Sequence, residues 1–107
     1  MKSLSVTEPV LLILLSLADQ PRHGYAILQD VQEISDGRVV LSTGTLYGAL
    51  RRLLDGAWIE RLEEEDAPRG RQSYRLTARG RRSLQLEVGR LKELTRVATL
   101  RVAQKET

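Results

Sequence analysis

Cysteine is absent from the 107 residues, and histidine occurs once, as His23. The chain therefore has no disulfide, no thiolate zinc site and no thiol nucleophile, and a single histidine excludes a multi-histidine metal site. Phenylalanine is also absent, and one tryptophan and three tyrosines are the only aromatic residues, which argues against a base-stacking platform for RNA. These absences exclude most enzyme chemistries, so we expect neither a catalyst nor a bound cofactor or metal.

Long apolar runs are missing too. The longest stretch, Val10–Ala18, is interrupted by Ser16, and a membrane-spanning helix needs about 20 apolar residues. With Lys2 in front, the stretch crudely imitates a signal peptide, but Glu8 and Pro9 precede its apolar part. The chain length predicts one small domain, and the composition, with 41% hydrophobic and 29% charged residues, is typical of a soluble protein. We therefore expect a cytoplasmic protein without membrane contact.

The basic residues are mostly arginine, because only three of the 17 Lys and Arg residues are lysine. Residues 69–82 hold six arginines and no carboxylate, and the acidic run 63–66 precedes them. The planar guanidinium group suits phosphate oxygens better than an ammonium does. The pattern fits a polyanion-binding surface, and it also fits a solvated face that carries both signs of charge.

Apolar periodicity predicts two helices in the first third of the chain. The first runs from about Thr7 to Ala18, with a proline in its first turn, where the missing N–H costs little. The second runs from about Gly24 to Ile34 and stops at the turn-forming pair Asp36–Gly37. Its predicted buried face is a row of residues three apart: Tyr25, Leu28, Val31 and Ile34.

A third helix is predicted from a cap at Ser42 or Thr43 to about Asp55–Gly56. Its apolar side comprises Leu46, Ala49, Leu50, Leu53 and Ala57, and its outer side comprises Gly44, Gly48, Arg51 and Asp55, flanked by Tyr47 and Arg52. A glycine inside a helix costs roughly 1 kcal/mol relative to alanine. Two outward glycines therefore favour a partner that approaches the backbone closely, such as a DNA groove, with the helix N-terminus facing phosphate. The hydroxyl of Tyr47 either donates to a phosphate or lies sideways on the core.

After Trp58, itself expected in the core, the apolar period becomes two, which predicts a hairpin. Its strands contain Ile59 with Leu62 and Tyr74 with Leu76, and the polar segment 64–71 forms the tip. At that tip, two arginines flank a glycine, either as minor-groove contacts or as solvated loop residues. They are Arg69 and Arg71.

A last helix is predicted from a cap at Thr77 to about Ala103, and its apolar residues form a heptad seam. The helix is longer than the small body can cover, so we expect a homodimer through this seam. The expected dimer residues are Leu84, Val88, Leu91, Leu94, Thr95, Ala98 and Val102. The predicted fold is thus mainly α with a small β-hairpin: a winged helix-turn-helix DNA-binding domain over 1–76 and a dimerisation helix over 77–107.

Several short strings, in order, resemble the PadR family of bacterial transcriptional regulators. They are residues 23–25, 44–47, 49–53, 56–59, 69–71 and 74–77, followed by Gly80. The resemblance covers about residues 8 to 85, and the short C-terminal helix is similar to the smaller subfamily, which dimerises through it. The chain departs from the family at Gly48, where proline is usual.

The function expected from the residues and the resemblance is sequence-specific binding of double-stranded DNA as a homodimeric repressor on a palindromic operator. The expected DNA-binding residues are Ser42, Thr43, Gly44, Thr45, Tyr47, Gly48, Arg51, Arg69 and Arg71. The alternative is a winged-helix module that binds an acidic protein. We expect either a small apolar effector, bound between the long helices or against the N-terminal domain, or no effector at all. The resemblance implies that binding of planar drugs needs a tryptophan on the last helix, and this last helix has no aromatic residue.

Overall fold

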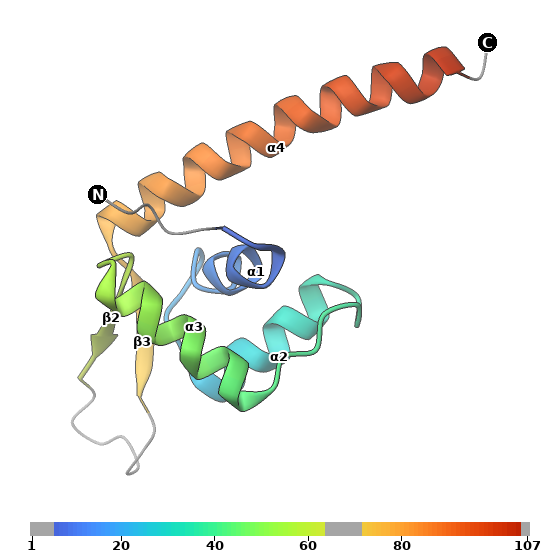
Figure 1. The fold of residues 1–107 in the computed structure, drawn as a ribbon. Coiled ribbons are helices and arrows are strands. Elements are labelled where there is room, and N and C mark those ends of the chain that lie inside the picture. The colour runs from blue at the N-terminus through green and yellow to red at the C-terminus, as the bar shows by residue number, and fades with distance from the viewer. Residues whose placement is uncertain (1–5, 64–71, 106–107) are drawn as a thin grey trace.

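The computed structural model describes residues 6–63 and 72–105, which form four helices and three strands. In chain order they are α1 (Glu8–Ser16), β1 (Arg22–His23), α2 (Gly24–Ile34), α3 (Thr43–Asp55), β2 (Ile59–Leu62), β3 (Ser73–Leu76) and α4 (Ala78–Lys105). The three short helices and the strands form what we call the body, and α4 lies above it and continues past its edge (Figure 1). The predicted fold class, mainly α with a small hairpin and a long last helix, is confirmed.

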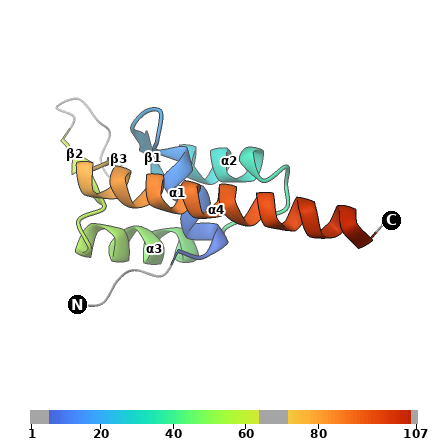
Figure 2. The same ribbon diagram turned by 90° about the horizontal axis from the view of Figure 1, so that it is seen from above.

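The core of the body is aliphatic and draws on all three short helices. Ile13 of α1, Ile27 of α2 and Leu46 of α3 have no exposed surface at all. Helix α1 is apolar on nearly every side because it packs against α2 and also lies under α4 (Figure 2). The predicted apolar side of α3 is confirmed for its four helical members, which are Leu46, Ala49, Leu50 and Leu53.

The predicted buried face of α2 is partly wrong. Tyr25 is 65% exposed and Ile34 is 44% exposed, whereas Ile27 is fully buried beside Val31. A step of three residues turns the helix by about 300°, so a row of four drifts across half its circumference. Both ends of the predicted row therefore rotate out of the core, and the buried face follows Gly24, Ile27 and Val31.

Two helix ends also differ from expectation. Helix α1 ends at Ser16, because the next two residues bond to carbonyls three residues back rather than four. Helix α3 ends at Asp55, so Ala57 is exposed instead of lying on the buried side. Ala57 adopts a left-handed φ of 60° and Trp58 N–H donates to the Leu53 carbonyl, which together terminate α3 in a Schellman motif.

The sheet has three antiparallel strands in the order β1-β3-β2, one more than predicted. Ile59 pairs with Leu76 in the hairpin, and Arg22 of the two-residue strand β1 pairs with Tyr74 on its other side. A strand this short has no alternation for sequence analysis to detect. The predicted tip, residues 64–71, lies outside the described residues.

Helix α4 changes its surroundings along its length. Near its start Leu84 is buried, and Val88 and Leu91 are partly covered. Farther on, Leu94 is 50% exposed and Val102 is 61% exposed. The C-terminal end of α4 projects past the edge of the body (Figure 2). No helix among the described residues is both long and apolar enough to cross a membrane.

Candidate nucleic-acid interface

The N-terminal turn of α3 is exposed and only partly capped. The Ser42 hydroxyl accepts the N–H of Thr45 at 3.1 Å and donates to the Thr45 hydroxyl oxygen at 2.9 Å. The first N–H groups of an α-helix have no partner within the helix, and those of Thr43 and Gly44 precede the one that Ser42 caps. Because helix N-termini are electropositive, this turn is suited to a phosphate.

The two outward glycines of α3 face open space. A Cβ atom built on Gly44 or on Gly48 would meet no other atom within 4 Å, apart from the local chain. Packing inside the protein therefore gives no reason for glycine at either position. The predicted outer face exists, and its backbone is open to a partner.

Tyr47 lies to one side of that face, over the start of α2. Its hydroxyl oxygen is 2.5 Å from the position that a Cβ on Gly24 would take, so Gly24 makes room for the ring. The Tyr47 side chain nevertheless remains 47% exposed. It packs sideways, as one of the two expectations had it, and its exposed part is still available to a ligand.

The two arginines of α3 differ from Arg90 and Arg96 of α4. Arg51 and Arg52 are exposed, and no described carboxylate lies within ion-pair distance of either. On α4, Arg96 donates to Glu93 at 2.7 Å, and this hydrogen bond lowers the pKa of the Glu93 carboxyl and raises the pKa of Arg96. The pair Glu87–Arg90 behaves in the same way. Arg90 and Arg96 of α4 are thus paired with carboxylates, whereas neither arginine of α3 is paired with a described carboxylate.

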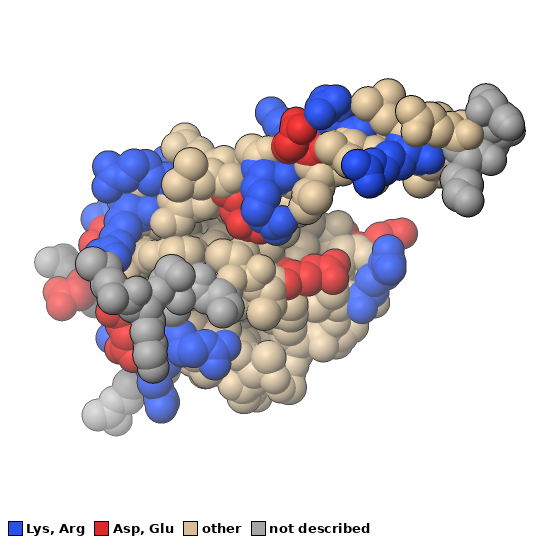
Figure 3. Space-filling view, turned by 45° about the horizontal axis from the view of Figure 1, so that its top comes forward, with Lys and Arg blue, Asp and Glu red and all other residues tan. Residues whose placement is uncertain are grey.

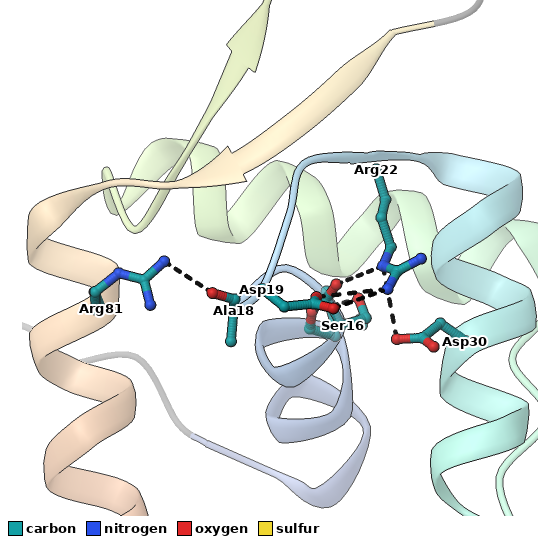
Figure 4. Close-up of polar contacts among 7 residues, drawn as sticks. Ser16, Ala18, Asp19, Arg22, Asp30 and Arg81 are labelled. Atoms are coloured by element: carbon teal, nitrogen blue, oxygen red, sulfur yellow. Dashed lines mark hydrogen bonds and ion pairs between the residues drawn. The ribbon is translucent and has the colours of Figure 1, made fainter.

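The predicted arginine cluster divides into groups with different roles. Arg75 pairs with Glu60 on the neighbouring strand at 2.6 Å, and Arg81 donates to the Ala18 carbonyl at 3.0 Å (Figure 4). A cation near the C-terminal end of α1 is electrostatically favourable, so Arg81 has a role in stabilising the fold. Arg79 and Arg82 are exposed, and basic side chains gather on the side where α4 begins (Figure 3).

The two tip arginines and the single histidine have separate outcomes. Arg69 and Arg71 lie outside the described residues, so the structure does not place them. His23 caps α2, because its Nδ1 accepts the Ala26 N–H at 3.3 Å, in keeping with the structural role expected for it. Tyr25, two residues after His23, is exposed. The sequence did not predict this exposure, because the spacing of Tyr25 from the apolar residues of α2 suggested a core position.

Other site types find little support in the described part of the chain. Residues 6–63 and 72–105 contain no group of three His, Asp or Glu side chains that could hold a metal ion. A shallow hollow lies along α2, lined mainly by polar residues that include Gln29, Asp30 and Glu33. It does not include the α4 residues expected beside an effector.

The Arg22 side chain crosses the gap between α1 and α2. Its Nε donates to the Ser16 carbonyl at 2.7 Å and lies 3.7 Å from the Asp30 carboxylate, with Asp19 at 3.5 Å from the same guanidinium group (Figure 4). Arg22 is therefore a structural arginine and is not available to a polyanion.

Known proteins resemble the chain in sequence and in fold. The sequence pattern of the "Transcriptional regulator PadR-like family" matches residues 13–86. An uncharacterized 37.1 kDa protein in transposon TN4556 of Streptomyces fradiae is 41% identical over 86 residues, which cover 79% of this chain. The chain spans only 23% of that relative.

Solved structures show the same fold. A PadR family transcription regulator from Clostridium difficile superimposes with a TM-score of 0.75 at 23% identity, covering 90% of this chain and 99% of that one. Bacillus subtilis PadR, solved in complex with operator DNA, gives a TM-score of 0.64 at 21% identity, covering 74% of this chain and 45% of that one.

Proposed function

Since the chain belongs to the PadR-like family of transcriptional regulators, we propose that it binds double-stranded DNA through α3 and represses transcription there. The open face of α3 carries this proposal. It combines free N–H donors at Thr43 and Gly44, open backbone at Gly48 and an uncompensated cation at Arg51. Such a face offers donors to phosphates and lets a major groove approach closely. The fold shared with Bacillus subtilis PadR, which binds operator DNA, supports the proposal.

We further propose a homodimer, in which residues 77–107 form the dimerisation helix and residues 1–76 the DNA-binding domain. Ala98 and Val102 of the heptad seam, and Leu94 beside the seam, are exposed on α4. A heptad seam matches a second copy of itself, since each apolar side chain inserts between those of the partner helix. Dimerisation removes this surface from water.

A symmetric dimer presents two copies of α3, so the operator we propose is palindromic. Its half-site centres lie about 10 base pairs apart, or a multiple of that, because both helices must reach the same side of the duplex. A small apolar effector would act by changing this spacing from between the two α4 helices, beside Leu91 and Leu94. If such an effector exists, Leu91→Trp fills the space and abolishes release of DNA by it; release that is unchanged in Leu91→Trp contradicts this effector site.

The testing experiment measures binding to duplexes from the region upstream of the protein's own gene, at several salt concentrations. We expect affinity to fall steeply with salt, and to be higher for one sequence than for its scrambled form. Arg51→Ala weakens DNA binding by about 1–3 kcal/mol. Lys92→Ala, which removes an exposed cation from α4, has little effect on DNA binding. If the protein's binding to these duplexes shows neither a dependence on salt nor a sequence preference, the proposal is contradicted. A protein-interaction module is then favoured.

A further inference from the structure

The start of α4 is bonded directly to the end of α3. The Thr77 hydroxyl donates to the Ala57 carbonyl at 2.6 Å, and the Thr77 N–H donates to the Trp58 carbonyl at 3.0 Å. The same hydroxyl oxygen accepts the Gly80 N–H at 3.0 Å, so Thr77 also caps α4. One side chain therefore both begins the long helix and fastens it to the turn that follows α3.

Gly80 makes this contact close. A Cβ atom at Gly80 would overlap the Trp58 carbonyl group and come within 3.1 Å of the Trp58 Cα. The obstacle is backbone, which cannot move aside as the end of a flexible side chain would. Any residue other than glycine would therefore push the first turn of α4 away from the end of α3. By contrast, a Cβ at Gly89, on the same helix, would meet nothing within 4 Å.

Both partners of this contact are themselves fixed. Trp58 is 9% exposed and belongs to the core, and its N–H closes the Schellman motif at the end of α3. On another side of α4, Arg81 donates to the Ala18 carbonyl, and Leu84 is buried in the body (Figure 4). The first two turns of α4 are thus held from two directions, which makes the connection a rigid joint rather than a flexible linker.

We propose that Thr77 and Gly80 are positioning residues that set the angle between α3 and α4, and through it the half-site spacing that the dimer recognises. The inference rests on the proposed function, since it assumes that α4 joins two copies and α3 reads DNA. Neither residue would touch DNA or the partner copy.

The magnitude of the effect follows from the length of α3. With 13 residues, α3 is about 20 Å long, and the joint lies at its C-terminal end while the open face begins at the other. A rotation of about 10° at the joint moves the N-terminal turn by about 3.5 Å, close to the rise of one base pair. In Figure 1 the N-terminal end of α3 lies far from α4, as this lever requires. A small change at the joint is therefore enough to shift the preferred spacing.

The first experiment measures the spacing of the two α3 helices without DNA. Because the chain has no cysteine, Arg52→Cys places one spin label per copy on α3, and Lys92→Cys places one on α4. Each labelled protein is compared with its Gly80→Ala, Thr77→Val and Gly89→Ala versions by pulsed electron paramagnetic resonance. We expect Gly80→Ala and Thr77→Val to shift or broaden the Arg52 label distance and leave the Lys92 distance unchanged. Gly89→Ala changes neither distance.

Unchanged Arg52 distances in both variants overturn the proposal, and so does an equal change at Lys92, which would place the effect in the dimer seam. If Gly80→Ala does not fold, Thr77→Val decides the question, because it keeps the branched shape and removes only the hydroxyl. A wild-type protein that binds no DNA overturns the proposed function alone, since the label distances do not depend on DNA.

The second experiment uses unlabelled protein and duplexes selected by the wild type from a random pool, with the half-site spacing varied one base pair at a time. We expect Gly80→Ala to lose at least about tenfold in affinity at the wild-type spacing, to bind a single half-site as before, and to prefer a different spacing. A loss that is equal for the half-site and the full site shows a merely structural role and overturns the proposal.

Discussion

The body and the outer half of α4 carry the same kinds of aliphatic residue, with opposite burial. In the body, Ile13, Ile27 and Leu46 have no exposed surface, whereas Leu94 and Val102 on α4 are 50% and 61% exposed. Burial of a leucine-sized side chain is worth about 1.5–3 kcal/mol. The body obtains this stabilisation within one chain, and the outer half of α4 cannot. The comparison shows that one part of the sequence encodes a fold, while the other leaves apolar side chains exposed, and we propose that a second copy covers them.

The largest effect that would break this comparison is expected from Leu94→Glu. A symmetric dimer would bury the new carboxylate twice, so we expect the dimer dissociation constant to rise by at least about 100-fold, or 2.8 kcal/mol. The body should keep its fold, because Leu94 is half exposed and is not part of the hydrophobic core or packed against it. Sedimentation equilibrium measures the association, and far-ultraviolet circular dichroism measures the fold.

Leu100→Glu is the matched control for this substitution. Leu100 is 53% exposed, nearly the same as Leu94, but it lies on the opposite side of α4 from the heptad seam, whereas Leu94 flanks the seam. We expect a protein that dimerises like the wild type. Equal dissociation in both variants would show that the seam is wrongly assigned, and dissociation in neither would show that α4 is not the dimer contact.

A smaller effect is expected when glycine is replaced by alanine in each of the two regions. Gly48→Ala on α3 and Gly89→Ala on α4 each add a methyl group where nothing lies within 4 Å. Both should therefore raise the free energy of unfolding, by about 0.5–1 kcal/mol, because alanine favours the helix. Only Gly48→Ala should weaken DNA binding, since the added group stands where a groove would approach. Thermal unfolding and fluorescence anisotropy on the same samples measure the two quantities.

If Gly48→Ala bound DNA as well as Gly89→Ala does, the glycine face of α3 would have no close partner. The substitution is informative because stability and binding are expected to change in opposite directions. A general loss of folding cannot imitate that result.

Much of the fold could be predicted from the sequence because local signals were strong. Ser42 as a cap, Asp36–Gly37 as a stop and the change of period after Trp58 place their elements within a residue or two. Strand β1 could not be predicted, since its two residues form a strand only by pairing with β3. The face of α2 was wrong because spacing alone does not fix which side of a helix the neighbouring elements cover.

The candidate site was predicted less completely than the fold. The outward placement of Gly44, Gly48 and Arg51 followed from helix geometry and agrees with the structure. The roles of Arg75 and Arg81 did not follow, because their partners Glu60 and the Ala18 carbonyl are distant in sequence. Charge counts cannot separate arginines committed to the fold from those left for a ligand. The joint at Gly80 was invisible for the same reason, since its contact is with Trp58.

The last expected effect, on stability alone, comes from Ala57→Gly. Ala57 is one of the two positions where the body holds backbone strain. Among the described residues, the only non-glycine positions with positive φ are Asp36 and Ala57, both at Schellman helix ends in the body. Alanine is disfavoured in the left-handed region by about 1–2 kcal/mol, whereas glycine enters it freely but loses more entropy on folding. The net expectation is a gain of about 0.5–1 kcal/mol in the free energy of unfolding, seen as a Tm higher by a few degrees at fixed protein concentration. Asp36→Gly should gain less, because aspartate tolerates this conformation better than alanine does.

Ala57→Gly keeps the carbonyl that accepts the Thr77 hydroxyl, so DNA affinity should not change. A lower Tm would mean that the exposed methyl group of Ala57 stabilises the α3–β2 turn by more than its strain costs.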